Sequence, residues 1–196
     1  MNKRLSEIHR KTNETDVYIK LNIEGEGNAN IKTTIPFLDH MLDLFARHGM
    51  FDLEVLASGD TEIDEHHLIE DMGISFGKLI KRCLGDNRGI NRFGFASLPM
   101  DDSLVECSLD ISGRAYLVYN MMDKKFVIAD EKEKYELYEH FLKSLAFNAG
   151  ITLHFNLRYG FNLHHNIEAA FKAFGRALKD AVEVTSDIMP STKGCI

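Results

Sequence analysis

Hydrophobic and polar residues alternate along two separated segments of the chain, residues 14–25 and 102–113. Successive side chains of a strand point to opposite faces, so this alternation predicts a strand with one buried face. The apolar positions are Val17, Ile19, Leu21 and Ile23 in the first segment and Val105, Cys107, Leu109 and Ile111 in the second. Each segment ends at a glycine, Gly25 or Gly113. We therefore predict two half-buried strands that occupy equivalent places in the chain.

The same series of patterns follows each of these strands. A helix-like stretch covers residues 38–49 and again 138–150, and a second alternating stretch covers residues 50–59 and 151–160. Each series then reaches a helix that opens with two adjacent histidines and has a glutamate three residues after the second one. These helices continue with FGKLIK and FGRALK, respectively. Agreement at so many positions indicates an internal duplication.

The duplication predicts the fold class and the division of the chain. Its halves are residues 1–88 and 89–196, joined by the Gly- and Asn-rich segment GDNRGINR. Each half contains strands, a helix, a strand and a helix, and its sheet needs helices to cover one face. We expect one α+β domain in which two sheets pack on shared helices with pseudo-twofold symmetry. The second half has an insertion, DKKFVIADEKEKYE, which we interpret as an exposed charged loop.

Composition narrows the possible functions. The 196 residues are 44% hydrophobic and 27% charged, which is typical of a globular protein. A net charge of −7 argues against a nucleic-acid-binding surface, but a small anionic substrate needs only local positive charge. The polar first residues predict no secretion signal, and no apolar run reaches the roughly 20 residues of a membrane helix. The three cysteines, Cys83, Cys107 and Cys195, favour free thiols and a cytoplasmic location.

The paired histidines have the spacing of metal ligands. Residues four apart share a helix face, so the first histidine of each pair lines up with the glutamate. Adjacent residues point about 100° apart, so the two histidines of a pair cannot easily hold one ion together. Mixed imidazole and carboxylate ligands suit manganese, iron or zinc, among which the sequence does not choose. We predict two ions with these ligand sets: His66, Glu70, His140 and His165 for one, and His164, Glu168, His40 and His67 for the other.

Other polar residues near these positions call for simpler interpretations. A single pair of histidines on a helix is more often an ordinary surface pair, and only the recurrence of the pair favours metal binding. Asp71 is replaced by Ala169 in the second half, so we interpret it as a structural charge or a residue behind the ligands. His9 and His154 have no equivalents and are interpreted as ordinary polar residues. His48 occurs in one half only, which favours contact with substrate.

Several segments of the chain together resemble the imidazoleglycerol-phosphate dehydratase family of histidine biosynthesis. They are FLDHML, DEHHLIED, RFGFASLPMDDSL, DISGRAYL, HHNIEAAFKAFGRAL and PSTKG. The resemblance runs from RKTNETDV to the last residues, and it leaves no room for the phosphatase domain that some relatives carry. It implies an enzyme that removes water from D-erythro-imidazoleglycerol phosphate and produces imidazole acetol phosphate.

The resemblance also implies cofactors, assembly and residue roles. Members of this family are manganese-dependent, with two ions per active site, and they assemble as 24-subunit cages with active sites between subunits. The family's base lies in the TxET segment, here TNET, which implies that Glu14 is the base. Asp102 occupies the equivalent position in the second half. The residues implied for phosphate binding, whose types suit an anion, are Arg92, Arg114, Lys172, Ser191 and Lys193.

Two other function classes remain open from the sequence. Another binuclear metal enzyme, such as a phosphoesterase, would use similar ligands and would release phosphate from the same substrate. A non-catalytic metal-binding cage would use the repeat for assembly alone. The basic segment PSTKG argues against such a cage, because assembly alone gives it no role.

Overall fold

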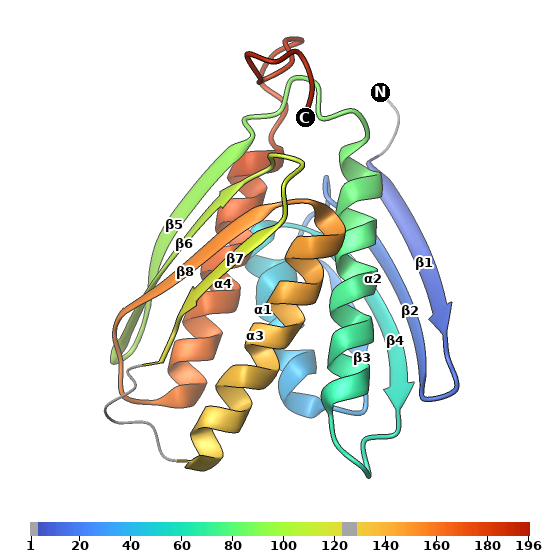
Figure 1. Ribbon diagram of the computed structural model, residues 1–196, viewed down its shortest axis with the longest axis vertical. Helices are drawn as coiled ribbons and strands as arrows, with labels where there is room; N and C mark the ends of the chain where they lie inside the picture. The colour runs from blue at the N-terminus through green and yellow to red at the C-terminus, as the bar shows by residue number, and fades with distance from the viewer. Residues whose placement is uncertain (1–3, 123–128) are drawn as a thin grey trace.

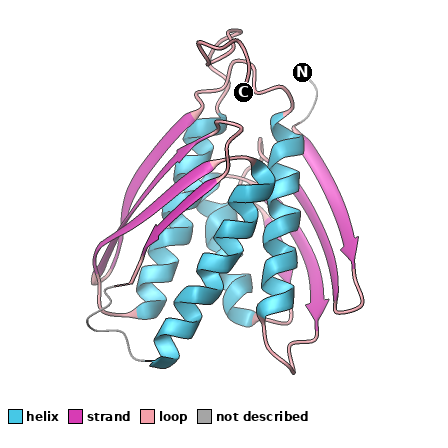
Figure 2. Ribbon diagram, viewed as in Figure 1, coloured by secondary structure: helices cyan, strands magenta, loops and turns pink. Residues whose placement is uncertain are grey.

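The computed structural model describes residues 4–122 and 129–196. Two four-stranded sheets form the outer layers of the molecule, and four helices lie between them (Figure 1). Colouring by secondary structure shows this arrangement most directly, with strands on both outer sides and helices in the middle (Figure 2). The predicted α+β fold with an internal duplication is therefore confirmed.

The two sheets have the same strand order. The first has the order β1-β2-β4-β3 and contains β1 (Leu5–Lys11), β2 (Thr15–Asn22), β3 (Ala29–Lys32) and β4 (Asp52–Gly59). The second has the order β5-β6-β8-β7 and contains β5 (Phe93–Met100), β6 (Ser103–Asp110), β7 (Tyr116–Asn120) and β8 (Thr152–Tyr159). In each sheet three strands are antiparallel and the edge strand, β3 or β7, runs parallel to its neighbour.

The alternating pattern places one face of each central strand in the core. Val17, Ile19 and Leu21 of β2 are fully buried, as are Val105 and Cys107 of β6. The residues between them are intermediate or exposed, as expected for a sheet that faces helices on one side and solvent on the other. The strands predicted from the alternation are confirmed.

Each pair of packed helices combines the two halves of the chain. The helices are α1 (Pro36–Gly49), α2 (His66–Leu84), α3 (Ala129–Ala149) and α4 (Leu163–Val182). Helix α1 of the first half packs against α4 of the second, and α2 of the first packs against α3 of the second. The halves therefore share one core. Within the described residues, none of the helices is long and apolar enough to cross a membrane.

Glycines let the paired helices approach closely. A Cβ atom on Gly73 of α2 would lie 2.5 Å from the carbonyl oxygen of Phe141 on α3. A Cβ atom on Gly175 of α4 would lie 2.6 Å from the carbonyl oxygen of Phe45 on α1. Both distances are shorter than atomic contact allows, so any larger residue would push the helices apart.

The interpretation of residues 123–136 as an exposed loop is wrong for its second part. Residues 123–128 lie outside the described part of the chain, but α3 begins at Ala129. Tyr135 is only 4% exposed, and it stands three residues before the buried Tyr138, six before Phe141 and seven before Leu142. This spacing forms the buried stripe of an amphipathic helix. The many charged residues around Tyr135 concealed that stripe in the sequence.

Candidate functional site

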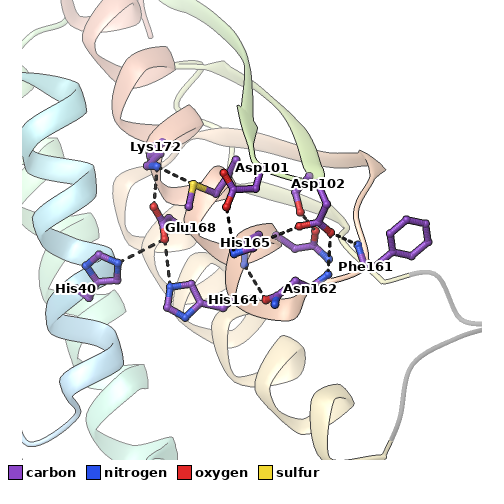
Figure 3. A network of polar contacts seen from close by, with 12 residues as sticks. His40, Asp101, Asp102, Phe161, Asn162, His164, His165, Glu168 and Lys172 are labelled. Atoms are coloured by element: carbon purple, nitrogen blue, oxygen red, sulfur yellow. Dashed lines mark hydrogen bonds and ion pairs between the residues drawn. The ribbon is translucent and has the colours of Figure 1, made fainter.

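His40, His164 and Glu168 form a cluster of possible metal ligands, here called the α1–α4 group. One ligand atom from each residue lies within 4.8 Å of the others. Nε2 of His40 is 3.5 Å from Oε2 of Glu168, and Nε2 of His164 is 3.2 Å from the same oxygen. Figure 3 shows both rings turned toward the carboxylate. The packing of α1 on α4 thus brings together residues that are more than a hundred positions apart in the sequence.

The carboxylate of Glu168 is buried but ionised. Its side chain is only 8% exposed, and Nζ of Lys172 donates a hydrogen bond to it over 2.6 Å. Burial by itself raises the pKa of Glu168, but Lys172 and His40 outweigh it, so the pKa lies below its usual value. Lys172 also contacts the sulfur of Met100 at 3.2 Å. A negatively charged oxygen is therefore held ready beside two imidazoles.

His66, Glu70 and His140 form the equivalent cluster in the other helix pair, here called the α2–α3 group. Nε2 of His140 lies 3.7 Å from Oε1 of Glu70, and the rings of His66 and His140 are 4.9 Å apart between centroids. Nε2 of His140 is buried and has no hydrogen-bond partner among the described residues. A buried ring nitrogen without a partner is costly unless something else binds it. Its chemistry fits a metal ligand.

The remaining two predicted ligands, His67 and His165, point elsewhere. Nδ1 of His67 lies 3.0 Å from Asp60, and Nδ1 of His165 lies 2.5 Å from Asp102. These hydrogen bonds raise the pKa of both histidines, and that of His165 lowers the pKa of Asp102 well below its usual range. One chain therefore brings together three of the four members of each predicted ligand set.

Four of the five predicted phosphate-binding residues surround one pocket. This pocket, here called the anion pocket, has a volume of about 230 Å³. The side chain of Arg92 is fixed by bidentate hydrogen bonds to Asp110, at 2.7 and 3.1 Å, and by a 2.8 Å hydrogen bond to the carbonyl of Pro190. Asp110 raises the pKa of Arg92, so its charge is permanent. The lining residues are Arg92, Ser112, Arg114, Ser191, Thr192, Lys193, Cys195 and Ile196.

The anion pocket and the histidine groups lie at opposite ends of the molecule. His164 is at the start of α4, whereas the backbone N–H of Arg92 donates to the carbonyl of Ala181 near its end. Figure 1 shows α4 running from the lower end of the molecule to the C-terminal segment at the top. The helix rises about 1.5 Å per residue, so His164 and Ala181 are separated by roughly 25 Å.

Two further predicted residues lie near the histidine groups. The carboxylate of Glu14, which directly precedes β2, is 57% exposed and lies 3.8 Å from Nδ1 of His67. His48 is partly buried on α1, and burial, followed by the positive charges of Lys172 and Arg176, lowers its pKa.

The other polar residues have structural roles or lie outside the site. Asp71 is buried and accepts hydrogen bonds from Arg10 and Thr15, which is consistent with a structural charge. His9 pairs with Asp16 on the exposed face of the first sheet. The sequence interpretation missed the contact of Asp60 with His67. An aspartate in the segment just before a helix is too common to identify such a role.

Comparisons with known proteins give matches over most of the chain. A family model described as imidazoleglycerol-phosphate dehydratase matches residues 33–178. Proteins of that name from Acetivibrio thermocellus and Syntrophus aciditrophicus are 51% and 49% identical to the chain. The first alignment covers 97% of both chains and the second covers 98% of both.

Solved structures give the same result. The imidazoleglycerol-phosphate dehydratase of Staphylococcus aureus N315 is 36% identical, with a TM-score of 0.79 over 92% of this chain and 99% of that one. The Pyrococcus furiosus protein, solved in complex with (S)-C348, is 34% identical, with a TM-score of 0.78 over 96% of this chain and 100% of that one.

The fold and these relatives place the chain among the hydro-lyases, enzymes that eliminate water by breaking a carbon–oxygen bond. The chain belongs to the imidazoleglycerol-phosphate dehydratase family. Its reaction converts imidazoleglycerol phosphate to imidazole acetol phosphate in histidine biosynthesis.

Proposed function

We propose that this dehydration depends on manganese and takes place in a site shared between subunits of a homo-oligomer, a 24-subunit cage. Each active site would hold two ions. The α1–α4 and α2–α3 groups would each supply three ligands from one chain, and His67 and His165 of another chain would complete the two sets.

The observation that carries this proposal is the separation of the two kinds of site. In the substrate, a three-carbon chain joins the imidazole ring to the phosphate, and with bonds of about 1.5 Å it spans less than ~10 Å. The histidine groups and the anion pocket of one chain are about 25 Å apart along α4. One substrate molecule cannot reach both within the same chain. A substrate held at both sites would therefore need one of them from a neighbouring subunit.

The ligand chemistry supports manganese. Both groups combine imidazole nitrogens with a carboxylate, and such mixed sets suit manganese, iron or zinc. The unpartnered nitrogen of His140 and the ionised carboxylate of Glu168 are ready to bind a cation. When bound, the ions supply Lewis-acid polarisation of the substrate's imidazole ring.

The residues of the chain would divide the rest of the reaction. Arg92, Arg114, Ser191 and Lys193 hold the phosphate and so fix one end of the substrate. The carboxylate of Glu14 takes a proton from the carbon next to the one that carries the departing hydroxyl. The C–H electron pair forms the new double bond as the C–O bond breaks, and the hydroxyl leaves with a proton as water. The enol that remains loses the proton of its oxygen and gains one at the carbon next to the ring, which gives the ketone product. His48 and Lys172 would contact the substrate between its two ends.

We also propose a cytoplasmic location. All three cysteines, Cys83, Cys107 and Cys195, are free, which is typical of proteins in a reducing compartment.

Mixing two inactive variants tests the shared site. Arg114→Ala should disable the anion pocket, and His164→Ala should disable the α1–α4 group, so each variant alone should have little activity with manganese. Oligomers that contain both variants should regain activity, because some sites combine an intact pocket from one chain with intact ligands from another. Mixed oligomers, verified by mass, that stay as inactive as their parents would contradict the proposal. Phosphate release from the substrate would indicate a phosphoesterase instead.

A further inference from the structure

A carboxylate holds the second histidine of each pair by the same ring nitrogen. Nδ1 of His67 lies 3.0 and 3.2 Å from the two carboxylate oxygens of Asp60. Nδ1 of His165 lies 2.5 Å from Oδ1 of Asp102, and Figure 3 shows this ring beside Asp101 and Asp102. Among the described residues, neither ring makes a polar contact with its own chain's α1–α4 or α2–α3 group.

This hydrogen bond determines which nitrogen is available to a metal ion. An ionised carboxylate can only accept hydrogen bonds, so Nδ1 of each ring must carry the hydrogen. In a neutral imidazole the other nitrogen, Nε2, then carries the lone pair. The same carboxylate also fixes the orientation of the ring and makes Nε2 a better donor to a metal.

We infer that Asp60 and Asp102 are positioning residues, which hold His67 and His165 through Nδ1 so that Nε2 faces a metal ion outside the chain's own ligand groups. The inference rests on the proposed function, because it requires metal sites that a second chain completes.

Asp102 is itself firmly held. Its Oδ2 accepts hydrogen bonds from the backbone N–H groups of Phe161 and Asn162, at 2.8 and 3.1 Å. The side chain of Asn162 caps α4 by accepting from the backbone N–H of His165, at 3.3 Å. Hydrogen bonds through Asp102 thus connect the ring of His165 to the turn between β5 and β6 and to the start of α4. Nε2 of His165 lies 3.7 Å from the exposed carboxylate of Asp101.

The two halves assign this task to different positions, which explains why the base is found in one half only. Asp102 directly precedes β6, as Glu14 directly precedes β2. In the second half the residue at this position, Asp102, holds His165. In the first half Asp60, which follows β4, holds His67 instead. Glu14 lies 3.8 Å from the ring and accepts no hydrogen bond through its carboxylate among the described residues. Its carboxylate is therefore left available for proton transfer.

Manganese titration tests the inference without relying on catalysis. Free Mn²⁺ can be followed by electron paramagnetic resonance as it is added to metal-free protein in the absence of substrate. We expect Asp60→Ala and Asp102→Ala each to weaken manganese binding by about 10- to 100-fold. The variant Asp60→Asn keeps an oxygen that can accept from Nδ1, so it should bind manganese within about tenfold of the wild type.

A matched control is available on the outer face of the first sheet. Nε2 of His9 lies 2.6 Å from Asp16, a carboxylate–histidine pair that involves the other ring nitrogen and lies outside the proposed ligands. Asp16→Ala should leave manganese binding unchanged. Size-exclusion chromatography at saturating manganese shows whether each variant is still assembled.

Three results are informative. Wild-type manganese affinity in both alanine variants would overturn the inference. Equal losses in Asp60→Ala and Asp60→Asn, together with lower thermal stability, would also overturn it, because they would show a merely structural role. A wild-type protein that binds no manganese would overturn the proposed function itself, and this outcome is distinct from the other two.

Discussion

Glu14 differs from the predicted metal ligands in its surroundings. It is largely exposed, whereas Glu168 is buried against Lys172 and two histidines. We expect Glu14→Gln to bind two manganese ions as the wild type does. Its turnover should fall by a factor of about 10² or more, because a general base is lost. Glu168→Gln should first lose manganese and therefore activity.

Titration of manganese into both variants while dehydration is followed distinguishes these roles. Added manganese should restore part of the activity of Glu168→Gln and none of that of Glu14→Gln. Recovery of Glu14→Gln would mean that Glu14 is a ligand.

Asp52, at the start of β4, gives a pH-dependent contribution to stability. The backbone N–H of Glu26, followed by Asn28 and Asn22, donates to its carboxylate and lowers its pKa. A carboxyl whose pKa is lower when folded stabilises the fold above its unfolded pKa of about 3.9. That contribution is lost as the pH falls through the folded pKa.

We expect Asp52→Ala to lower the free energy of unfolding by about 1 kcal/mol at pH 7, since the site is partly open to water. Urea denaturation from pH 7 to pH 3 should show the difference from the wild type shrinking below about pH 4. A difference that stays constant over this range would show that ionisation of Asp52 does not contribute.

At the residue scale, repetition made the histidines identifiable, because two matched pairs with two matched upstream histidines are improbable as surface residues. Single residues had no such signal. The sequence could not show that Lys172 pairs with Glu168, since a lysine four residues after a glutamate is also an ordinary surface pattern on a helix.

At the scale of elements, the close packing of the helix pairs depends on Gly73 and Gly175. Gly73→Ala and Gly175→Ala should each destabilise the protein by about 1–3 kcal/mol through overpacking, although alanine favours a helix by about 1 kcal/mol. Ser75→Ala is a matched control on α2, because the Ser75 hydroxyl is buried without a hydrogen-bond partner among the described residues.

Chemical denaturation at one protein concentration compares these variants with the wild type. The control should lie within about 0.5 kcal/mol of the wild type or be more stable. If the glycine variants matched the control, the helices could separate without cost.

The central strands and the helices, apart from the first part of α3, follow from periodicity, because each buries one face over many residues. The short edge strands β3 and β7 had no comparable signal. They contain 4 and 5 residues, and their place beside β4 and β8 depends on parallel pairing with strands distant in sequence. Pairing of that kind is decided by the packed molecule and not by local pattern.

At the scale of the whole molecule, metal and assembly should be coupled. A ligand that binds only the assembled state favours assembly by mass action. Elemental analysis of active protein should find close to two manganese ions per chain, and chelation should abolish activity and reduce the size of the oligomer. Light scattering before and after manganese is restored measures the size.

One ion or none per chain in active protein would contradict the two-ion proposal. A small oligomer that stays fully active without change in size would contradict the shared site. Zinc or iron in place of manganese would change the identity of the cofactor but leave the ligand sets intact.

The sequence predicted residues for both kinds of site, but it could not place one kind relative to the other. That relation depends on the length of α4, which carries the histidines at one end and leads to the anion pocket at the other. A sequence pattern does not give the distance between the histidine groups and the anion pocket, because that distance is defined only in the folded chain.

The pairing of helices across the halves has a consequence for the origin of the chain. His40 of the first half meets His164 and Glu168 of the second, and His140 of the second meets His66 and Glu70 of the first. A single ancestral half would have carried every ligand type yet completed neither group by itself. It would have needed a second copy of itself, with two identical groups related by symmetry. Joining the copies in one gene removed that constraint, so Glu14 and Asp102 were free to become different residues.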